Sequence, residues 1–339
     1  LYPQHPAGCH YYIHAVEGSD HPERGLAVAA KLPGLMPGVA HLVHMPSHIY
    51  IRSGYYKEGE ELNEKAVKSY YNYLGNYAPV ANNSLLYLVH NLHMQATCAN
   101  MDGRFTEALK ISNDCKNSFN SSFMDADGYI GVYAQYVYMT PYFTLIRFGK
   151  WNDVLNIAPV TEKRVYANLI WHYGRGLAFA REHSFEKANE ELQQLQKDMQ
   201  DLQLKEHPPA FNPGIAGARV AEKILEGVIA EEEDRLEEST ALLKEATERE
   251  DNMLYTEPKD WVHPARQYLG NVLIKSNRYA AAEKVYREDL AINPHNGWSL
   301  TGMSTALIMQ GKKKEGSTIQ KELNVSFSRA DTKITTSVF

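Results

Sequence analysis

A short pattern recurs along most of the chain. A residue that tolerates a left-handed backbone is followed two positions later by an apolar or aromatic residue, and typically five positions later by a small one. Its copies begin at Gly54, Gly103, Gly149, His183, Asp234, Asn277 and Gly311. Two of the intervals, from 149 to 183 and from 277 to 311, are 34 residues long. A period of this length is typical of helix–turn–helix repeats that stack into a solenoid.

The segments between these turns have helical periodicity. In "EKANEELQQLQKDMQDLQ" and "DRLEESTALLKEATERE" the apolar residues recur at intervals of three and four. No segment shows a convincing run of strand-like alternation. Each helical pair must stack on its neighbour to bury its apolar face, so the sequence predicts an all-α protein.

The stretch "ARQYLGNVLIKSNRYAAAEKVYREDLAINP" carries the clearest copy. Its landmarks are Leu269-Gly270, Leu273, Ala282, Tyr286 and Pro294. This stretch resembles the tetratricopeptide repeat (TPR), although Asp289 stands where that repeat has a small residue. The resemblance implies a right-handed α-solenoid of stacked helix–turn–helix hairpins.

The expected organisation has four parts. Residues 1–112 form histidine-rich TPR-like hairpins, 113–128 a loop rich in Ser, Asn and Asp, 129–255 degenerate hairpins, and 256–339 the C-terminal repeats and tail. Because the chain begins at Leu1 without a methionine, we expect the natural product to extend upstream.

Histidine is the compositional outlier, with nine of the 14 histidines in the first 93 residues. "CHYYIHAVE" and "VHMPSHIYI" both contain a His-x3-His pair, and the pairs lie 34 residues apart. The 34-residue spacing, counted back from Gly54, places one more turn at Asp20. Counted back from the turns at Asp20, Gly54 and Gly103, His10, His44 and His93 share one helix position, His14 and His48 a second, and His41 and His90 a third. The TPR resemblance implies that these positions, with Glu17, line one concave groove. Spacings of three, four and seven lie on one helix face independently of the resemblance. Pro46 is expected to kink the helix that carries the second pair.

Two histidines at i and i+4 on a helix are a standard metal clamp. We predict a metal site formed by His10, His14, His44, His48, His90 and His93, with Glu17 and His41 as additional or supporting groups. A set dominated by imidazole suits copper, zinc or iron and argues against calcium and magnesium. A two-metal centre and a single metal with supporting histidines both stay open. The spacing is similar to that of the dicopper sites of tyrosinase-like proteins. The alternative is a set of polar groove residues that bond to one another, to tyrosines or to water.

Other classes of function lack their signatures. No P-loop and no Gly-x-Gly-x-x-Gly sequence occurs, so no nucleotide cofactor is expected. The net charge of -6 gives no nucleic-acid footprint, and no apolar run approaches the ~20 residues of a membrane span. The compartment stays open.

Two unusual segments invite a second binding site. "WHYGRG" contains His172 and Arg175, and "EPKDWVHPARQYLG" contains Trp261 and Arg266. These residues are candidates for binding an anionic ligand. The alternative is structural, with Pro264 starting a helix and Trp261 as a hydrophobic plug.

The chain as a whole resembles an uncharacterised, histidine-rich family of TPR proteins common in bacteria. The matching stretches are His5–Glu17, His41–Tyr50, His90–His93 and Glu257–Gly270. The first hypothesis is a metal centre in the groove, with copper- or iron-dependent redox chemistry on a small substrate. The alternative is a non-catalytic scaffold that binds a peptide or protein partner in the groove.

Overall fold

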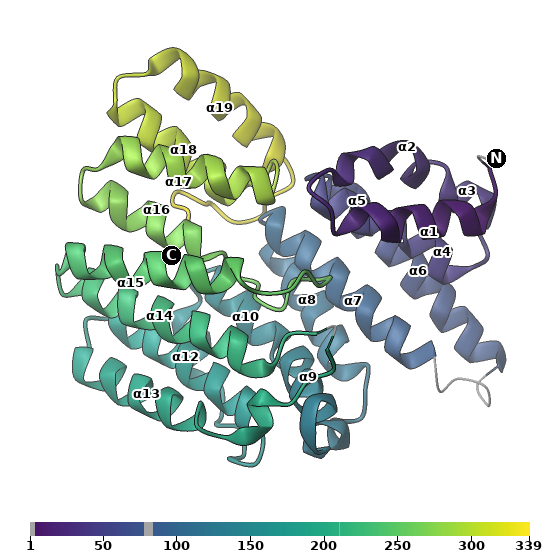
Figure 1. Cartoon of the computed structure of the whole chain (residues 1–339), viewed down its shortest axis with the longest axis horizontal. Coiled ribbons are helices and arrows are strands. Elements are labelled where there is room, and N and C mark those ends of the chain that lie inside the picture. The colour runs from purple at the N-terminus through teal and green to yellow at the C-terminus, as the bar shows by residue number, and fades with distance from the viewer. Residues whose placement is uncertain (1–3, 78–83, 210) are drawn as a thin grey trace.

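The computed structural model describes residues 4–77, 84–209 and 211–339, and over these ranges the regular structure is helical (Figure 1). None of the helices in these ranges has the length and apolarity needed to cross a membrane. The predicted all-α class is confirmed.

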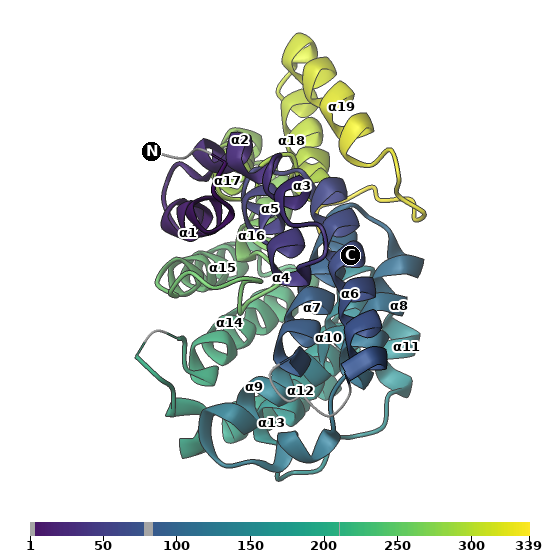
Figure 2. The same ribbon diagram turned by 90° about the vertical axis from the view of Figure 1, so that its right-hand side faces the viewer.

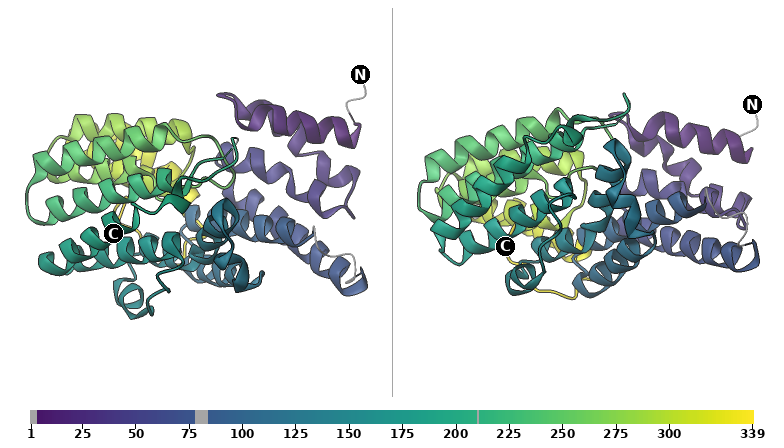
Figure 3. Two further views of the ribbon diagram at one scale, coloured as in Figure 1. Left: turned by 60° about the horizontal axis from the view of Figure 1, so that its bottom comes forward. Right: turned by 90° about the horizontal axis from the view of Figure 1, so that it is seen from below.

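The first part of the chain folds into short helices. They are α1 (Pro6–Glu17), the 3-10 helix η1 (Pro22–Gly25), α2 (Leu26–Ala29), α3 (Leu32–Leu35), α4 (Ala40–His44) and α5 (Pro46–Arg52). Figure 3 shows these helices stacked at one end of the molecule. The expected kink at Pro46 is present as a break between α4 and α5. The additional turn that the repeat spacing placed at Asp20 does not have a left-handed backbone.

Antiparallel helical hairpins follow. Their helix pairs are α5 with α6 (Tyr56–Tyr77), α7 (Ser84–Met101) with α8 (Phe105–Asn117), α10 (Thr140–Arg147) with α11 (Trp151–Asn156), α12 (Val165–Arg181) with α13 (Phe185–Asp198), α14 (Gly214–Glu232) with α15 (Leu236–Asp251), α16 (Ala265–Lys275) with α17 (Tyr279–Ile292), and α18 (Gly297–Met309) with α19 (Lys313–Ser326). The first helices of successive hairpins also contact each other, α12 with α14, α14 with α16 and α16 with α18. This stacking makes a TPR-like α-solenoid.

The turn pattern explains these hairpins. Every turn position found in the sequence, from Gly54 to Gly311, has a positive φ, between 55° and 78°. After each turn, the next N–H bonds to a carbonyl five residues earlier, as Lys150 N does to Leu145 O at 2.9 Å. This bond closes the end of the first helix. The small residue of the pattern is buried between the paired helices, as Ala188 and Ala282 are.

The predicted loop at 113–128 is shorter than expected. Helix α8 continues to Asn117, and the 3-10 helix η3 (Ser121–Asp125) covers part of the remainder before α9 (Gly128–Tyr138). A further connection, between α13 and α14, contains the 3-10 helix η4 (Leu202–Lys205).

The two ends of the solenoid meet. At the α5–α6 turn, Tyr56 donates a hydrogen bond to Pro294 O at 3.0 Å, and Arg52 reaches Ile292 O at 3.5 Å. Figure 2 views the molecule from the side on which the N-terminal helices α1 to α6 lie. After α19 the chain turns back toward the middle of the molecule (Figure 1). Along this return the exposed Asp331 accepts hydrogen bonds from the first N–H groups of α8. Near its end, the Ser337 hydroxyl contacts the buried Tyr286 hydroxyl at 2.8 Å. The first hairpins are therefore held against the last.

Candidate metal centre

Helix α1 is oriented by its apolar face. Cys9 and Ile13 are buried in a small core together with Leu32, Met45 and Ile49 of the neighbouring helices. Consecutive helical residues point about 100° apart, so His10 and His14 leave this core and face α4. This places the first histidine pair opposite the second.

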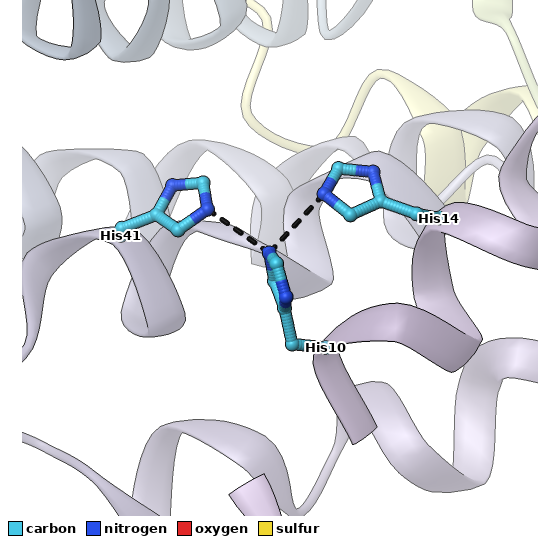
Figure 4. Close-up of side chains that lie close together, drawn as sticks. All are labelled: His10, His14 and His41. Carbon is cyan, nitrogen blue, oxygen red and sulfur yellow. Dashed lines mark hydrogen bonds between the residues drawn. The ribbon is translucent and has the colours of Figure 1, made fainter. Parts of the chain in front are cut away.

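Three imidazoles meet between α1 and α4, and we call His10, His14 and His41 the first trio. Their Nε2 atoms converge: His10 Nε2 lies 3.0 Å from His41 Nε2 and 3.2 Å from His14 Nε2 (Figure 4). Burial, and then the neighbouring histidines, lower the pKa of His10, and lower that of His41 to about 4. Both rings are therefore neutral at pH 7, with nitrogens available for coordination.

A second trio, His44, His48 and His90, joins α4, α5 and α7. His44 Nε2 lies 2.7 Å from His48 Nε2 and 3.1 Å from His90 Nε2. In each trio one nitrogen from every ring lies within 4.8 Å of the other two. The trios are adjacent, because the ring centroids of His14 and His48 are 5.7 Å apart and those of His41 and His44 are 6.0 Å apart.

Asn63 of α6 sets the tautomer of His44. The Asn63 side chain donates from Nδ2 to Gly59 O at 2.8 Å, so its Oδ1 faces His44 Nδ1 at 2.7 Å. An amide oxygen only accepts, so His44 carries its proton on Nδ1. His44 Nε2 therefore offers a lone pair to the centre of the second trio.

One carboxylate serves both trios. Glu17 Oε1 lies 2.9 Å from His14 Nδ1, and Glu17 Oε2 lies 2.8 Å from His48 Nδ1. The contacts with His48 and His14 hold the pKa of Glu17 below its usual value, although burial acts in the opposite direction. A carboxylate on the far nitrogen of a histidine orients the ring and increases its basicity toward a metal.

Glu257 supplies a second carboxylate, which the sequence interpretation missed. It forms an ion pair with His48 Nδ1, and its side chain is only 6% exposed. Burial lowers the pKa of His48, but Glu257 and Glu17 outweigh burial and raise it to about 10. Burial, and then the charge of His48, keep the pKa values of His44 and His90 well below the usual range. The second trio therefore holds one extra proton at neutral pH, on His48.

The donor set fits a metal of the imidazole-binding class. Nitrogens at 2.0–2.1 Å from a tetrahedral ion are about 3.3 Å from each other. The trios show 2.7–3.2 Å between neighbouring Nε2 atoms, so small ring movements suffice. At these distances two Nε2 atoms share a hydrogen bond, so one of them carries a proton. A bound cation would take the place of these protons.

Two members of the predicted set differ in where the structure places them. His41, expected as an additional or supporting group, lies in the first trio. His93 was expected among the ligands, yet it belongs to none of the groups found in the described residues. Its ring packs edge-on against Tyr136 of α9 at 5.0 Å, and burial lowers its pKa to about 4. On α7, three residues of separation turn His93 far enough from His90 to reach α9 instead of α4.

The four residues considered for anion binding have partners within the protein. His172 Nδ1 and Arg175 Nε contact the two oxygens of Glu191 at 2.5 and 2.6 Å. Trp261 is 2% exposed and donates to His263 O. Arg266 forms a bidentate pair with Asp251 at 2.6 and 2.7 Å. A ligand-binding role for them stays a prediction.

Comparison with known proteins gives a fold likeness only. No family model matches the chain. No curated protein matches it. Among solved structures, the chain is similar to the P58(IPK) TPR domain, with 12% identity and a TM-score of 0.27 over 97% of this chain and 88% of that one. It is also similar to the structure of Naa15/Naa10 bound to HypK-THB, with 16% identity and a TM-score of 0.28 over 96% of this chain and 42% of that one. TM-scores of this size support no inference about function, and the resemblance to a histidine-rich bacterial family stays a prediction.

Proposed function

We propose that this TPR-like protein binds two adjacent metal ions, one in each histidine trio. The observation that carries the proposal is the convergence of three Nε2 atoms in both trios, with separations of 3.0 and 3.2 Å in the first and 2.7 and 3.1 Å in the second. Polar residues that merely line a groove would have no reason to aim the same nitrogen at a common point. The carboxylates behind His14 and His48 support the same reading, because they stabilise rings that share a positive charge or a metal.

The donor set suits copper, zinc or iron, because all six residues of the trios are histidines. Glu17 and Glu257 contact His14 and His48 at Nδ1, not at the Nε2 atoms that face the trios. Zinc has no redox chemistry, and copper binds a given nitrogen site more tightly than iron. Three protein nitrogens leave a coordination position on each ion for a substrate. We therefore propose copper-dependent redox chemistry on a small substrate, with iron as the second choice of metal.

A scaffold that binds a peptide or protein in its groove is the competing function. The TPR-like fold is compatible with it. However, a residue after α19 already contacts the α16–α17 hairpin, where Ser337 bonds to the Gln267 carbonyl and the Tyr286 hydroxyl. A buried carboxylate pair around one histidine also has no role in peptide binding. The metal proposal accounts for more of the observed contacts.

Metal content tests the proposal directly. Metal-free protein is incubated separately with Cu(I), Zn(II) and Fe(II), desalted, and analysed for metal per chain by mass spectrometry. We expect about two ions in the wild type, one in His10→Ala, one in His44→Ala and none in the double variant. His207→Ala removes an exposed histidine and serves as the matched control. Equal metal content in the wild type and the double variant would overturn the proposal.

The redox part has a separate readout. Copper-loaded protein is supplied with ascorbate, and oxygen consumption is followed with an electrode. We expect consumption that His10→Ala and His44→Ala each abolish, since both ions would be needed. Two bound ions without oxygen consumption would contradict the redox part and leave metal binding intact.

A further inference from the structure

Four tyrosines line one cavity, and one of them, Tyr136, is the residue that packs against His93. Tyr129, Tyr133 and Tyr136 follow one face of α9, and Tyr166 is the second residue of α12. We call these residues the tyrosine cluster. The centroids of neighbouring rings are 6.1–6.4 Å apart. With Met253 and Asp260, they line a cavity of about 30 Å³, which accommodates about two water-sized groups.

A carboxylate lines one part of this cavity. Asp260 is partly buried, and its Oδ2 accepts a hydrogen bond from Asn212 Nδ2 at 2.8 Å. Burial raises the pKa of Asp260, while neutral donors from Asn212 and Thr256 act against that effect. Within the described ranges no lysine, arginine or histidine nitrogen lies within 4.0 Å of this carboxylate.

The charge of Asp260 reaches every ring of the cluster. After burial, Asp260 contributes to raising the pKa of Tyr129, Tyr133, Tyr136 and Tyr166. The four phenols therefore surround a site of negative potential. Aromatic faces are also negative, and they attract cations within about 6 Å. The carboxylate and the aromatic rings therefore both favour a cationic ligand.

A purely structural role explains only part of this arrangement. The Asn212 side chain accepts a hydrogen bond from Leu254 N and donates one to Leu254 O. These two bonds already hold Asn212 against the chain that leads to Asp260, without any help from the Asp260 carboxylate. A neutral asparagine at position 260 would accept the hydrogen bond from Asn212 as well. A partly buried carboxylate without a cationic partner costs stability, and the cavity beside it supplies the place for the missing cation.

We propose that the tyrosine cluster and Asp260 bind the primary ammonium group of a small organic amine. The size of the cavity selects this group, because an ammonium is about as large as one water molecule and a quaternary ammonium is several times larger. Its N–H groups would donate to Asp260, and the rings would cover its alkyl neighbour, next to Met253. This site shares no residue with the two histidine trios and does not depend on a bound metal.

Isothermal titration of the metal-free full chain tests the site. The probes are propylammonium, its neutral analogue 1-propanol, and tetramethylammonium. We expect propylammonium to bind, 1-propanol to bind at least tenfold more weakly, and tetramethylammonium to be excluded. Asp260→Asn is expected to weaken propylammonium binding at least tenfold. Asp153→Asn changes the net charge equally at an exposed position and is expected to have no effect.

A second variant guards against loss of folding at position 260. Tyr129→Leu, at a half-buried position, is expected to weaken propylammonium binding about two- to fivefold, while Tyr71→Leu at an exposed position of α6 leaves it unchanged. Wild-type protein that binds 1-propanol as tightly as propylammonium would overturn the proposal. So would an Asp260→Asn variant that binds like the wild type. An Nα-acetyl-lysine amide that binds tenfold tighter than propylammonium would identify a protein side chain as the occupant and refute the small amine.

Discussion

Replacement of Glu17 by glutamine separates the roles of the two carboxylates. The substitution preserves the shape of the side chain, but an amide presents one NH2 group in place of one accepting oxygen. In the structure, Glu17 is the carboxylate that contacts His14, whereas His48 has both Glu17 and Glu257. If the trios bind metal, Glu17→Gln will therefore damage the first trio more than the second.

The expected loss of metal affinity at each trio follows from this difference in carboxylate contacts. Loss of a partner that orients a metal-ligating histidine typically costs 10–100-fold in affinity, which is about 1.4–2.7 kcal/mol. We expect this loss at the first trio in Glu17→Gln, and less than about tenfold at the second trio. Glu257→Gln should show the reverse, with a loss at the second trio and none at the first.

Zinc titration against a chromophoric chelator measures each trio alone. The His44→Ala background retains only the first trio, and His10→Ala retains only the second. Each glutamine variant is combined with each background at pH 7.5. The reasoning is refuted if Glu17→Gln leaves the first trio at wild-type affinity, or if Glu257→Gln weakens the first trio as strongly as the second.

Three further predictions concern stability, measured by urea unfolding. Burial raises the pKa of Glu250 from 4.5 to about 7. Its stabilising contribution is therefore complete below pH 4.5 and is lost as the pH rises through 7, so the wild type should lose up to about 3 kcal/mol between pH 5 and 8 that Glu250→Gln does not lose. Gly270→Ala would place a Cβ 2.3 Å from the Tyr286 ring and should cost about 1–3 kcal/mol, whereas Gly75→Ala, with open space around it, should gain about 0.5–1 kcal/mol; equal effects would contradict the packing. Asp331→Ala removes the cap of α8 and should cost about 1 kcal/mol; no change would show that the tail does not stabilise that helix.

The repeated turn could be recognised from the sequence because it depends on local chemistry. Gly149 and Asn277 differ as residues, but both tolerate the left-handed backbone that ends a helix. The histidine pairs could be placed for a similar reason, since four residues of spacing put His10 and His14 on one face wherever the helix lies. The same 34-residue period placed a turn at Asp20, but Asp20 does not have the left-handed backbone that ends the first helix at the other turns.

The members of each trio depended on contacts between distant segments. His93 shares a helix position with His10 and His44 in the repeat frame, but α9 packs beside it and offers Tyr136. Glu257 lies in a segment that the sequence marked as unusual, yet nothing in that segment says that it reaches His48. Asn63 gave no signal at all, because its role depends on the one ring that α6 places beside it.

The sequence by itself determined the helices, the turns and the faces on which the histidines lie, since these follow from backbone preferences and from a period of 3.6 residues. Only the tertiary structure decided which imidazoles meet, which carboxylates stand behind them, and where a carboxylate remains without a cation. The physical reason is distance along the chain: Glu17 and Glu257 approach the same ring because packing closes the solenoid, and no local preference encodes that closure.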